Sequence, residues 1–271
     1  MAIDLRSVEY PELPEIDRSM LKVLKATFEY PANPQVKGAR LANDICFFCE
    51  SAEGETGGGP LLYKTWFLVL DIASYIPPEH PWQTSLIRAI DDLRRRDGPI
   101  SAHEADKSIF WKDLPSLSLC VREKWDGIGD ETSDDFARWK NLTSFVAQLT
   151  SDDYAPWLSL PIWQLRDALE EPPVEGPEME CRMWAACEWV LRCAQLIYVE
   201  MNEKEALSEE LARALQGGPL WKDMPARSHE RWLFWKKRFA EFMGDAERLG
   251  LKGDIVGRLS ETLKKMDAVE E

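Results

Sequence analysis

The segment that decides the fold spans residues 179–201 and reads MECRMWAACEWVLRCAQLIYVEM. It contains no Gly or Pro and is long enough for about six helical turns. Apolar side chains occupy nearly every face of such a helix, which is typical of a helix surrounded by protein or by lipid. Arg182, Glu188 and Arg192 interrupt the run, and such charges disfavour a position in lipid. We therefore predict the central helix of a soluble helical domain.

Glu188 is the most informative charged residue of this segment. Trp184 precedes it by four residues and Arg192 follows it by four, so the three side chains share one helix face. A carboxylate among apolar neighbours is either paired with a cation or used chemically. The spacing favours pairing with Arg192, and a functional role remains the alternative. Asp71, inside the second strongly apolar segment at residues 61–76, poses the same question.

The composition disfavours several classes of protein. A net charge of −15 argues against nucleic-acid binding and against polybasic membrane binding. An anionic substrate would have to be held by a local cationic patch or by a metal ion, although solubility is the simpler explanation of the charge. Twelve tryptophans are an unusually large number, and they predict either extensive core packing or an aromatic cavity.

The cysteines and the start of the chain indicate a cytoplasmic protein. Residues 1–16 lack the basic and apolar regions of a signal peptide, and no segment has the composition of a membrane span. Three of the six cysteines lie in the apolar segment 179–201, where Cys behaves as a small hydrophobic residue. With three histidines in the chain, a zinc site is not favoured, and reduced cysteines are expected.

The pattern of apolar residues predicts an all-α fold of about nine or ten helices, since no segment alternates with a period of two residues. We expect an extended arm at residues 1–18, a single compact domain at 19–266 and a fraying acidic tail at 267–271. Within the domain, halves at about 36–150 and 177–266 would be joined by a Pro-rich linker near 170–177.

A weak internal repeat accompanies these halves. Residues 110–115 read FWKDLP and residues 220–225 read LWKDMP. Each copy follows an apolar helix that carries a tryptophan and then an acid, Trp66 with Asp71 and Trp184 with Glu188. A duplication would bring the two acids together near a pseudo-twofold axis. Chance similarity is the alternative, because the spacings differ between the halves.

Several segments together resemble a fungal family of uncharacterised all-helical proteins. They are IPPEHPWQTSLIRAIDDL at 76–93, the WKDLP motif, MWAACEWVLRCAQ at 183–195 and RSHERWLFWKKRF at 227–239. The resemblance extends over about residues 61–266 and rests on scattered aromatic residues. Genes of this type occur beside secondary-metabolite pathways, and some atypical, humulene-type terpene cyclases look similar. The resemblance therefore implies a small-molecule, terpenoid or polyketide role.

A terpene cyclase needs carboxylates that hold Mg²⁺, cations that bind the diphosphate and an aromatic cavity that stabilises carbocations. The usual Asp-Asp-x-x-Asp motif is absent, and residues 43–50 are only a degenerate form of the second motif. The candidates are Asp71 and Glu188 for catalysis, Asn43, Asp44, Glu50, Asp71 and Glu188 for Mg²⁺, Arg192, Arg231, Lys236 and Arg238 for the diphosphate, and Phe47, Trp66, Trp184, Trp189 and Trp232 for the cavity. Core packing of the tryptophans and a solvated helix flank for the cations are the simpler readings.

Three hypotheses follow. The first is a class I-like, Mg²⁺-dependent cyclase of a prenyl diphosphate. The second is a metal-free binding protein or cyclase for a hydrophobic intermediate, in which an acid transfers protons. The third is a helical protein-interaction module in which Glu188 and Asp71 are paired with cations in a packed core. None of them involves nucleic acid or a membrane span, and a homodimer is compatible with each.

Overall fold

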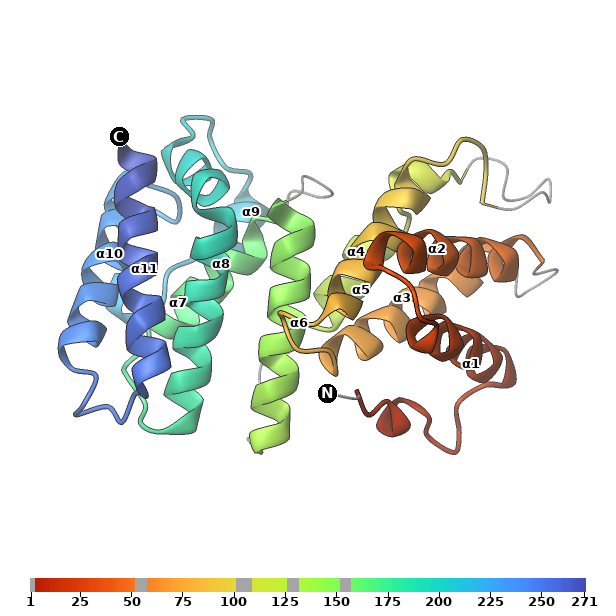
Figure 1. Ribbon diagram of the computed structural model, residues 1–271. Coiled ribbons are helices and arrows are strands. Elements are labelled where there is room, and N and C mark those ends of the chain that lie inside the picture. The colour runs from red at the N-terminus through yellow and green to blue at the C-terminus, as the bar shows by residue number, and fades with distance from the viewer. Residues whose placement is uncertain (1–2, 52–57, 101–108, 126–131, 152–156) are drawn as a thin grey trace. The chain divides into compact units, whose positions relative to one another are not determined.

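The structure is a computed structural model that describes residues 3–51, 58–100, 109–125, 132–151 and 157–271 (Figure 1). These ranges contain eleven α-helices, three 3-10 helices and one isolated bridge between Pro99 and Phe110. The predicted all-α class is confirmed. The eleven helices of the described ranges are close to the nine or ten that were expected, and the shortest are α5 and α9, with 7 and 6 residues.

The chain divides into two compact units, Met1–Gly127 and Ile128–Glu271. The Pro-rich segment near 170–177, which was expected to join two halves, lies inside the second of these units. The first unit contains η1 (Arg6–Val8), α1 (Glu15–Glu29), α2 (Pro34–Glu50), α3 (Gly58–Ser74), α4 (Pro81–Arg94), η4 (Trp111–Asp113) and α5 (Leu117–Glu123).

The start of the first unit differs from the predicted extended arm. η1 and the beginning of α1 both fall within residues 1–18. Leu5, Val8 and Leu13 are buried, so apolar side chains attach this segment to the unit and stabilise its local helical turns.

The helices α2 and α4 form a close pair in the first unit. A Cβ atom at Gly38 would lie 2.5 Å from Arg88 Cβ and 3.0 Å from the Ser85 carbonyl oxygen, so the close approach requires glycine. Asn33 begins α2 by accepting a 2.9 Å hydrogen bond from the Val36 amide. α1 joins the pair, since Phe28 stacks on Trp82 of α4 with 4.8 Å between ring centroids.

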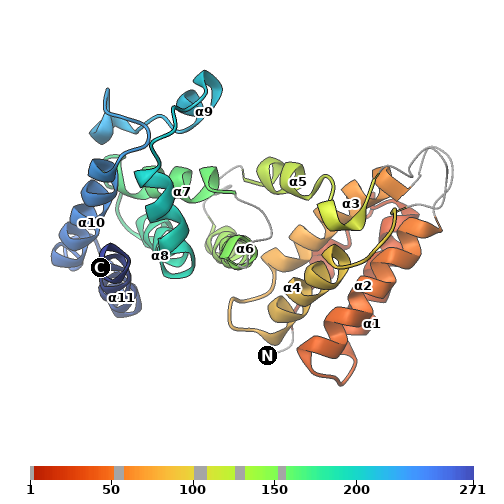
Figure 2. The same ribbon diagram turned by 90° about the horizontal axis from the view of Figure 1, so that it is seen from above.

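The second unit contains α6 (Ser133–Ser151), α7 (Ser159–Leu169), α8 (Pro177–Asn202), α9 (Glu209–Ala214), η5 (Pro219–Trp221), α10 (His229–Gly244) and α11 (Gly253–Glu270). α8 includes the whole predicted central helix and packs against α6, α7, α10 and α11. Figures 1 and 2 both show α8 between α6 and α11. The helix starts after Gly176 at φ 76°, with Pro177 in its first turn, and is kinked at Cys193 (φ −122°, ψ 15°).

The acidic tail is helical, contrary to the prediction that residues 267–271 fray. α11 continues to Glu270, whose carboxylate accepts hydrogen bonds from Trp232 Nε1 (2.7 Å) and Lys236 Nζ (2.6 Å). Asp267 also pairs with Lys236 at 2.7 Å. These contacts with α10 hold the last turn of α11 in place.

The two copies of the repeated motif have different hydrogen bonds. In the first copy, Trp66 Nε1 of α3 donates to the Pro115 carbonyl oxygen at 2.8 Å. In the second copy, the Pro225 carbonyl accepts from Trp221 of the motif itself at 3.0 Å.

No helix in the described ranges is long and apolar enough to cross a membrane.

Candidate functional site

Glu188 lies at the centre of a cluster of polar side chains that come from α6, α8 and α11. Its side chain is buried, with 3% of the residue surface exposed. Oε1 accepts hydrogen bonds from Arg192 Nε at 3.0 Å and from Ser144 Oγ at 2.9 Å, and Oε2 accepts from Arg258 Nη2. The Arg258 guanidinium lies 4.4 Å from the centre of the Trp184 ring. We call Ser144, Trp184, Glu188, Arg192 and Arg258 the Glu188 cluster.

The cluster keeps Glu188 ionised. Burial alone would raise the pKa of its carboxyl. The charge and hydrogen bond of Arg258, followed by Arg192 and Ser144, outweigh burial, so the pKa lies below its ordinary value. A carboxylate with a lowered pKa is a poor proton donor at neutral pH. The pairing of Glu188 with Arg192 that their spacing suggested is present, whereas Arg258 and Ser144 were not anticipated.

A second buried carboxylate occurs at Glu170, at the end of α7. Glu170 and Arg231 are both fully buried. Oε1 accepts from Arg231 Nε (2.7 Å) and Trp235 Nε1 (2.6 Å), and Oε2 accepts from the Gly218 amide (2.7 Å) and Arg231 Nη2 (3.0 Å). We call Glu170, Gly218, Arg231 and Trp235 the Glu170 cluster. It links the end of α7 to α10 and to the segment before η5.

This geometry does not fit the predicted role of Arg231 in diphosphate binding. Its Nη1 atom donates to the carbonyl oxygens of Leu215 (2.6 Å) and Ala226, and its other nitrogens donate to Glu170. The guanidinium therefore has neither solvent access nor enough free donors for a substrate. Sequence reasoning missed Glu170 because it was assigned to the Pro-rich linker, 61 residues from its partner.

The other two predicted diphosphate ligands of α10 also have protein partners. Lys236 pairs with Asp267 and Glu270 of α11. Arg238 pairs with Glu241 at 2.6 Å and donates from Nε to the Leu169 carbonyl oxygen at 3.0 Å. These contacts stabilise the packing of α10 and leave less of each cation available to a ligand.

Two of the predicted acids of the first unit, Asp71 and Asp44, each contact a different residue of the protein. Asp71 Oδ1 lies 2.6 Å from Lys124 Nζ, and Asp44 accepts a 2.8 Å hydrogen bond from Thr27 Oγ1. Burial raises the pKa of Asp44, although Thr27 and Arg40 oppose the shift. Asn43 accepts a hydrogen bond from Arg96.

The proposed Mg²⁺ ligands are divided between the two units. Glu50 is exposed at the end of α2, and Asp71 and Glu188 belong to different units. Within the described ranges, no group of three or more His, Cys, Asp or Glu side chains is arranged to hold a metal ion.

Most of the predicted cavity tryptophans are core residues. Trp66, Trp189 and Trp232 are fully buried, and Trp232 donates to Glu270. Trp184 is half-buried against Arg258 in the Glu188 cluster. Their helical spacing thus reflects core packing at three positions and contact with a charged group at the fourth.

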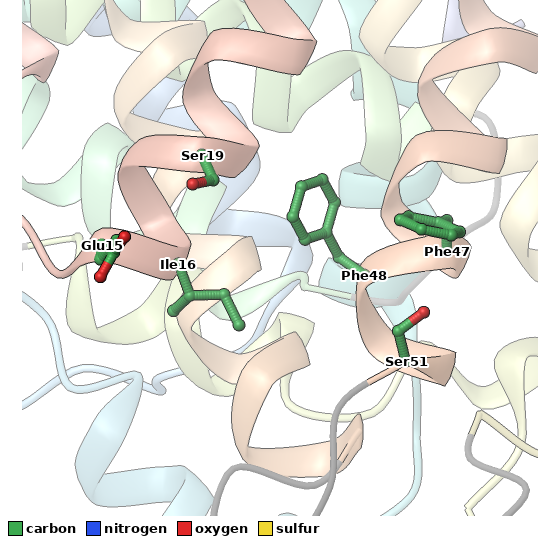
Figure 3. Close-up of a pocket in the computed structure, with 6 residues that line it drawn as sticks. All are labelled: Glu15, Ile16, Ser19, Phe47, Phe48 and Ser51. Atoms are coloured by element: carbon green, nitrogen blue, oxygen red, sulfur yellow. The ribbon is translucent and has the colours of Figure 1, made fainter.

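Phe47, another predicted cavity residue, lines a pocket. This pocket lies between α1 and α2 and has a volume of about 520 Å³; it is lined by Glu15, Ile16, Ser19, Phe47, Phe48 and Ser51 (Figure 3). Figure 3 shows Phe48 pointing toward α1. Phe47 is 66% exposed and contacts Phe48 edge-to-face, with 5.9 Å between centroids. We call this the α1–α2 pocket.

The comparisons with known proteins identify a family. A family model described as "Protein of unknown function (DUF3632)" matches residues 66–239, more than half of the 271 residues. No curated protein and no solved structure was found to match the chain. The matched range includes Glu188 and the whole Glu170 cluster, while the α1–α2 pocket precedes it. The chain belongs to this family of unknown function, DUF3632.

Proposed function

We propose that the chain binds a small, mostly apolar molecule in the α1–α2 pocket. The observation that carries this proposal is an open pocket of about 520 Å³ in which three apolar side chains, Ile16, Phe47 and Phe48, lie beside three polar ones. Ligand sites commonly have volumes of roughly 300–1,000 Å³ and this composition. A ligand would also cover Phe47, whose exposure to water is otherwise unfavourable.

The lining favours a neutral or cationic polar group on the ligand. Glu15 contributes a carboxylate, Ser19 and Ser51 contribute hydroxyls, and no Lys or Arg is among the lining residues that the structure describes. A carboxylate repels phosphate groups and accepts hydrogen bonds from hydroxyl or ammonium groups. A prenyl alcohol therefore suits the pocket better than the corresponding diphosphate. Such a ligand fits the hypothesis of a metal-free binding protein for a hydrophobic intermediate.

The proposal includes a cytoplasmic location. No disulfide joins the six cysteines, which all lie in the described ranges and are buried, and burial raises the pKa of the Cys187 thiol to about 12. Buried thiols that form no disulfide support a reducing environment. The competing proposal is the Mg²⁺-dependent cyclisation of a prenyl diphosphate, which the resemblance implies. The experiment must distinguish it from metal-free binding in the α1–α2 pocket.

The test is displacement of the neutral fluorophore N-phenyl-1-naphthylamine by farnesol and by farnesyl diphosphate, each with Mg²⁺ or with EDTA. We expect farnesol to displace the fluorophore regardless of Mg²⁺. Phe47→Ser should weaken farnesol binding about tenfold, because an aromatic contact worth about 1.4 kcal/mol or more is removed. Leu119→Ser is the matched control, since Leu119 is an exposed apolar residue of α5 in the same unit.

Two results would overturn the pocket proposal. Equal loss of binding in Phe47→Ser and Leu119→Ser would show non-specific surface binding. Binding of the diphosphate alone, dependent on Mg²⁺ and unchanged by Phe47→Ser, would instead support the cyclase.

A further inference from the structure

The Glu188 cluster has more positive than negative charge. Arg192 and Arg258 share the single carboxylate of Glu188, so one guanidinium lacks a countercharge within the cluster. Arg258 is partly withdrawn from water, with a side-chain exposure of 24%, whereas Arg192 is more exposed, at 36%. A partly buried cation without a countercharge is unfavourable. Neutralising Glu188 requires only one arginine, so the second needs another explanation.

The neighbouring turns of α8 repeat this arrangement. Glu180 lies two helical turns before Glu188 and is buried. Its carboxylate is 3.6 Å from Lys140 Nζ of α6 and 3.2 Å from Lys252 Nζ, just before α11. Each buried carboxylate of α8 is thus approached by two cations, one excess positive charge at each site. This is notable in a chain whose net charge is −15.

Both arginines retain hydrogen-bond donors. The Glu188 carboxylate accepts one hydrogen bond from Arg192 Nε and one from Arg258 Nη2. Each guanidinium has five N–H groups, so each has further groups that do not bind Glu188. The Arg258 Nε atom is buried and has no hydrogen-bond partner in the described part of the chain. The Trp184 ring lies against the same guanidinium, at 4.4 Å, and provides an apolar surface beside the donors.

We infer that the second unit binds a phosphate group at Arg192 and Arg258, without a metal ion. Planar guanidinium groups bind phosphate oxygens through paired hydrogen bonds, and Glu188 holds the two groups in position. Trp184 favours a phosphate ester with an aromatic or apolar substituent over free phosphate. The inference does not depend on the α1–α2 pocket.

The experiment is isothermal titration calorimetry of the full chain in EDTA at constant ionic strength. The ligands are inorganic phosphate and phenyl phosphate, and sodium chloride is the blank. We expect both phosphates to bind, phenyl phosphate more tightly because its ring can contact Trp184. Arg192→Gln and Arg258→Gln should each weaken binding about tenfold or more, the effect of losing one charge-assisted hydrogen bond.

Arg248→Gln is the matched control. Arg248 is an exposed arginine of the same unit and pairs with Asp245 at 2.6 Å, so its replacement makes the same change in net charge. Circular dichroism of each variant checks folding, and Arg192→Gln keeps the test decisive if Arg258→Gln unfolds. Absence of phosphate binding to the wild type would overturn the inference. An equal loss in Arg248→Gln would also overturn it, by showing a general charge effect.

Discussion

The Glu170 and Glu188 clusters both contain a buried carboxylate bound to arginine. They differ in the number of arginines and in how far these arginines are exposed to water. In the Glu170 cluster, one carboxylate meets one arginine, and both are fully buried. In the Glu188 cluster, one buried carboxylate meets two arginines that remain partly exposed. The first arrangement is balanced in charge, and four of the five N–H groups of the Arg231 guanidinium donate to oxygen atoms of the protein. The second keeps guanidinium N–H groups that do not bind Glu188, on two arginines that remain partly exposed, and a ligand site requires such groups.

The contrast shows that burial of an acid does not by itself indicate function. Glu170 is more buried than Glu188, but all of its contacts serve to join α7, α10 and the segment around Gly218. The informative feature is the accessibility and charge balance of the partners.

Arg231→Met should cause the largest loss of stability. The substitution leaves Glu170 buried without its cation and frees the carbonyl oxygens of Leu215 and Ala226. Breaking a buried ion pair in this way costs about 3–5 kcal/mol. Urea denaturation followed by tryptophan fluorescence measures the change, with Arg248→Met as the exposed control. A loss below about 1 kcal/mol would contradict a structural role for the Glu170 cluster.

Glu188→Gln should destabilise the protein less, by about 1–2 kcal/mol. Two arginines then lack their carboxylate, but both have access to water, which reduces the penalty. The same denaturation experiment applies, with Glu241→Gln of α10 as an exposed control. If Glu188→Gln costs as much as Arg231→Met, the two clusters are energetically equivalent and the proposed contrast is wrong.

The two clusters also differ in how much the sequence could reveal. The fold class followed from apolar periodicity, and the Glu188–Arg192 pair followed from i,i+4 spacing. Arg258 and Ser144 lie 70 and 44 residues from Glu188, so tertiary packing alone brings them together. Glu170 had no local signal, because its neighbours Pro172 and Pro173 suggested a linker.

The same limit explains the predicted ligands and cavity. Arg231, Lys236 and Arg238 share one cationic helix in sequence, yet their acidic or carbonyl partners come from distant segments or from adjacent turns. The spacing of the tryptophans correctly predicted that Trp66, Trp189 and Trp232 are buried. It could not distinguish a packed core from a cavity. Phe47 was predicted to line a cavity, but local sequence could not identify Ile16 and Ser19 of α1, which line the same pocket.

The pH dependence of stability offers a finer comparison. The pKa of Glu188 is lower in the folded protein than its ordinary value of 4.5. A lowered folded pKa adds stability above the unfolded pKa, and this contribution is lost as the pH falls through the folded pKa. The stability difference between wild type and Glu188→Gln should therefore be greatest near pH 7 and shrink below about pH 4.5. Denaturation curves at pH 7, 5 and 4 would test this, and a difference that grows on acidification would contradict it.

The smallest effect is expected for Arg192→Gln in phosphate-free buffer. Arg258 still neutralises Glu188, and removal of Arg192 relieves repulsion between two neighbouring cations, so stability should change by no more than about 0.5 kcal/mol. Addition of phosphate should then raise the melting temperature of the wild type and of Arg248→Gln, but not that of Arg192→Gln. This pattern would separate a cation that serves a ligand from one that serves the fold. A loss in phosphate-free buffer comparable to that of Arg231→Met would instead mean that the Glu188 cluster is a closed structural pair, with Arg258 alone unable to stabilise the buried carboxylate.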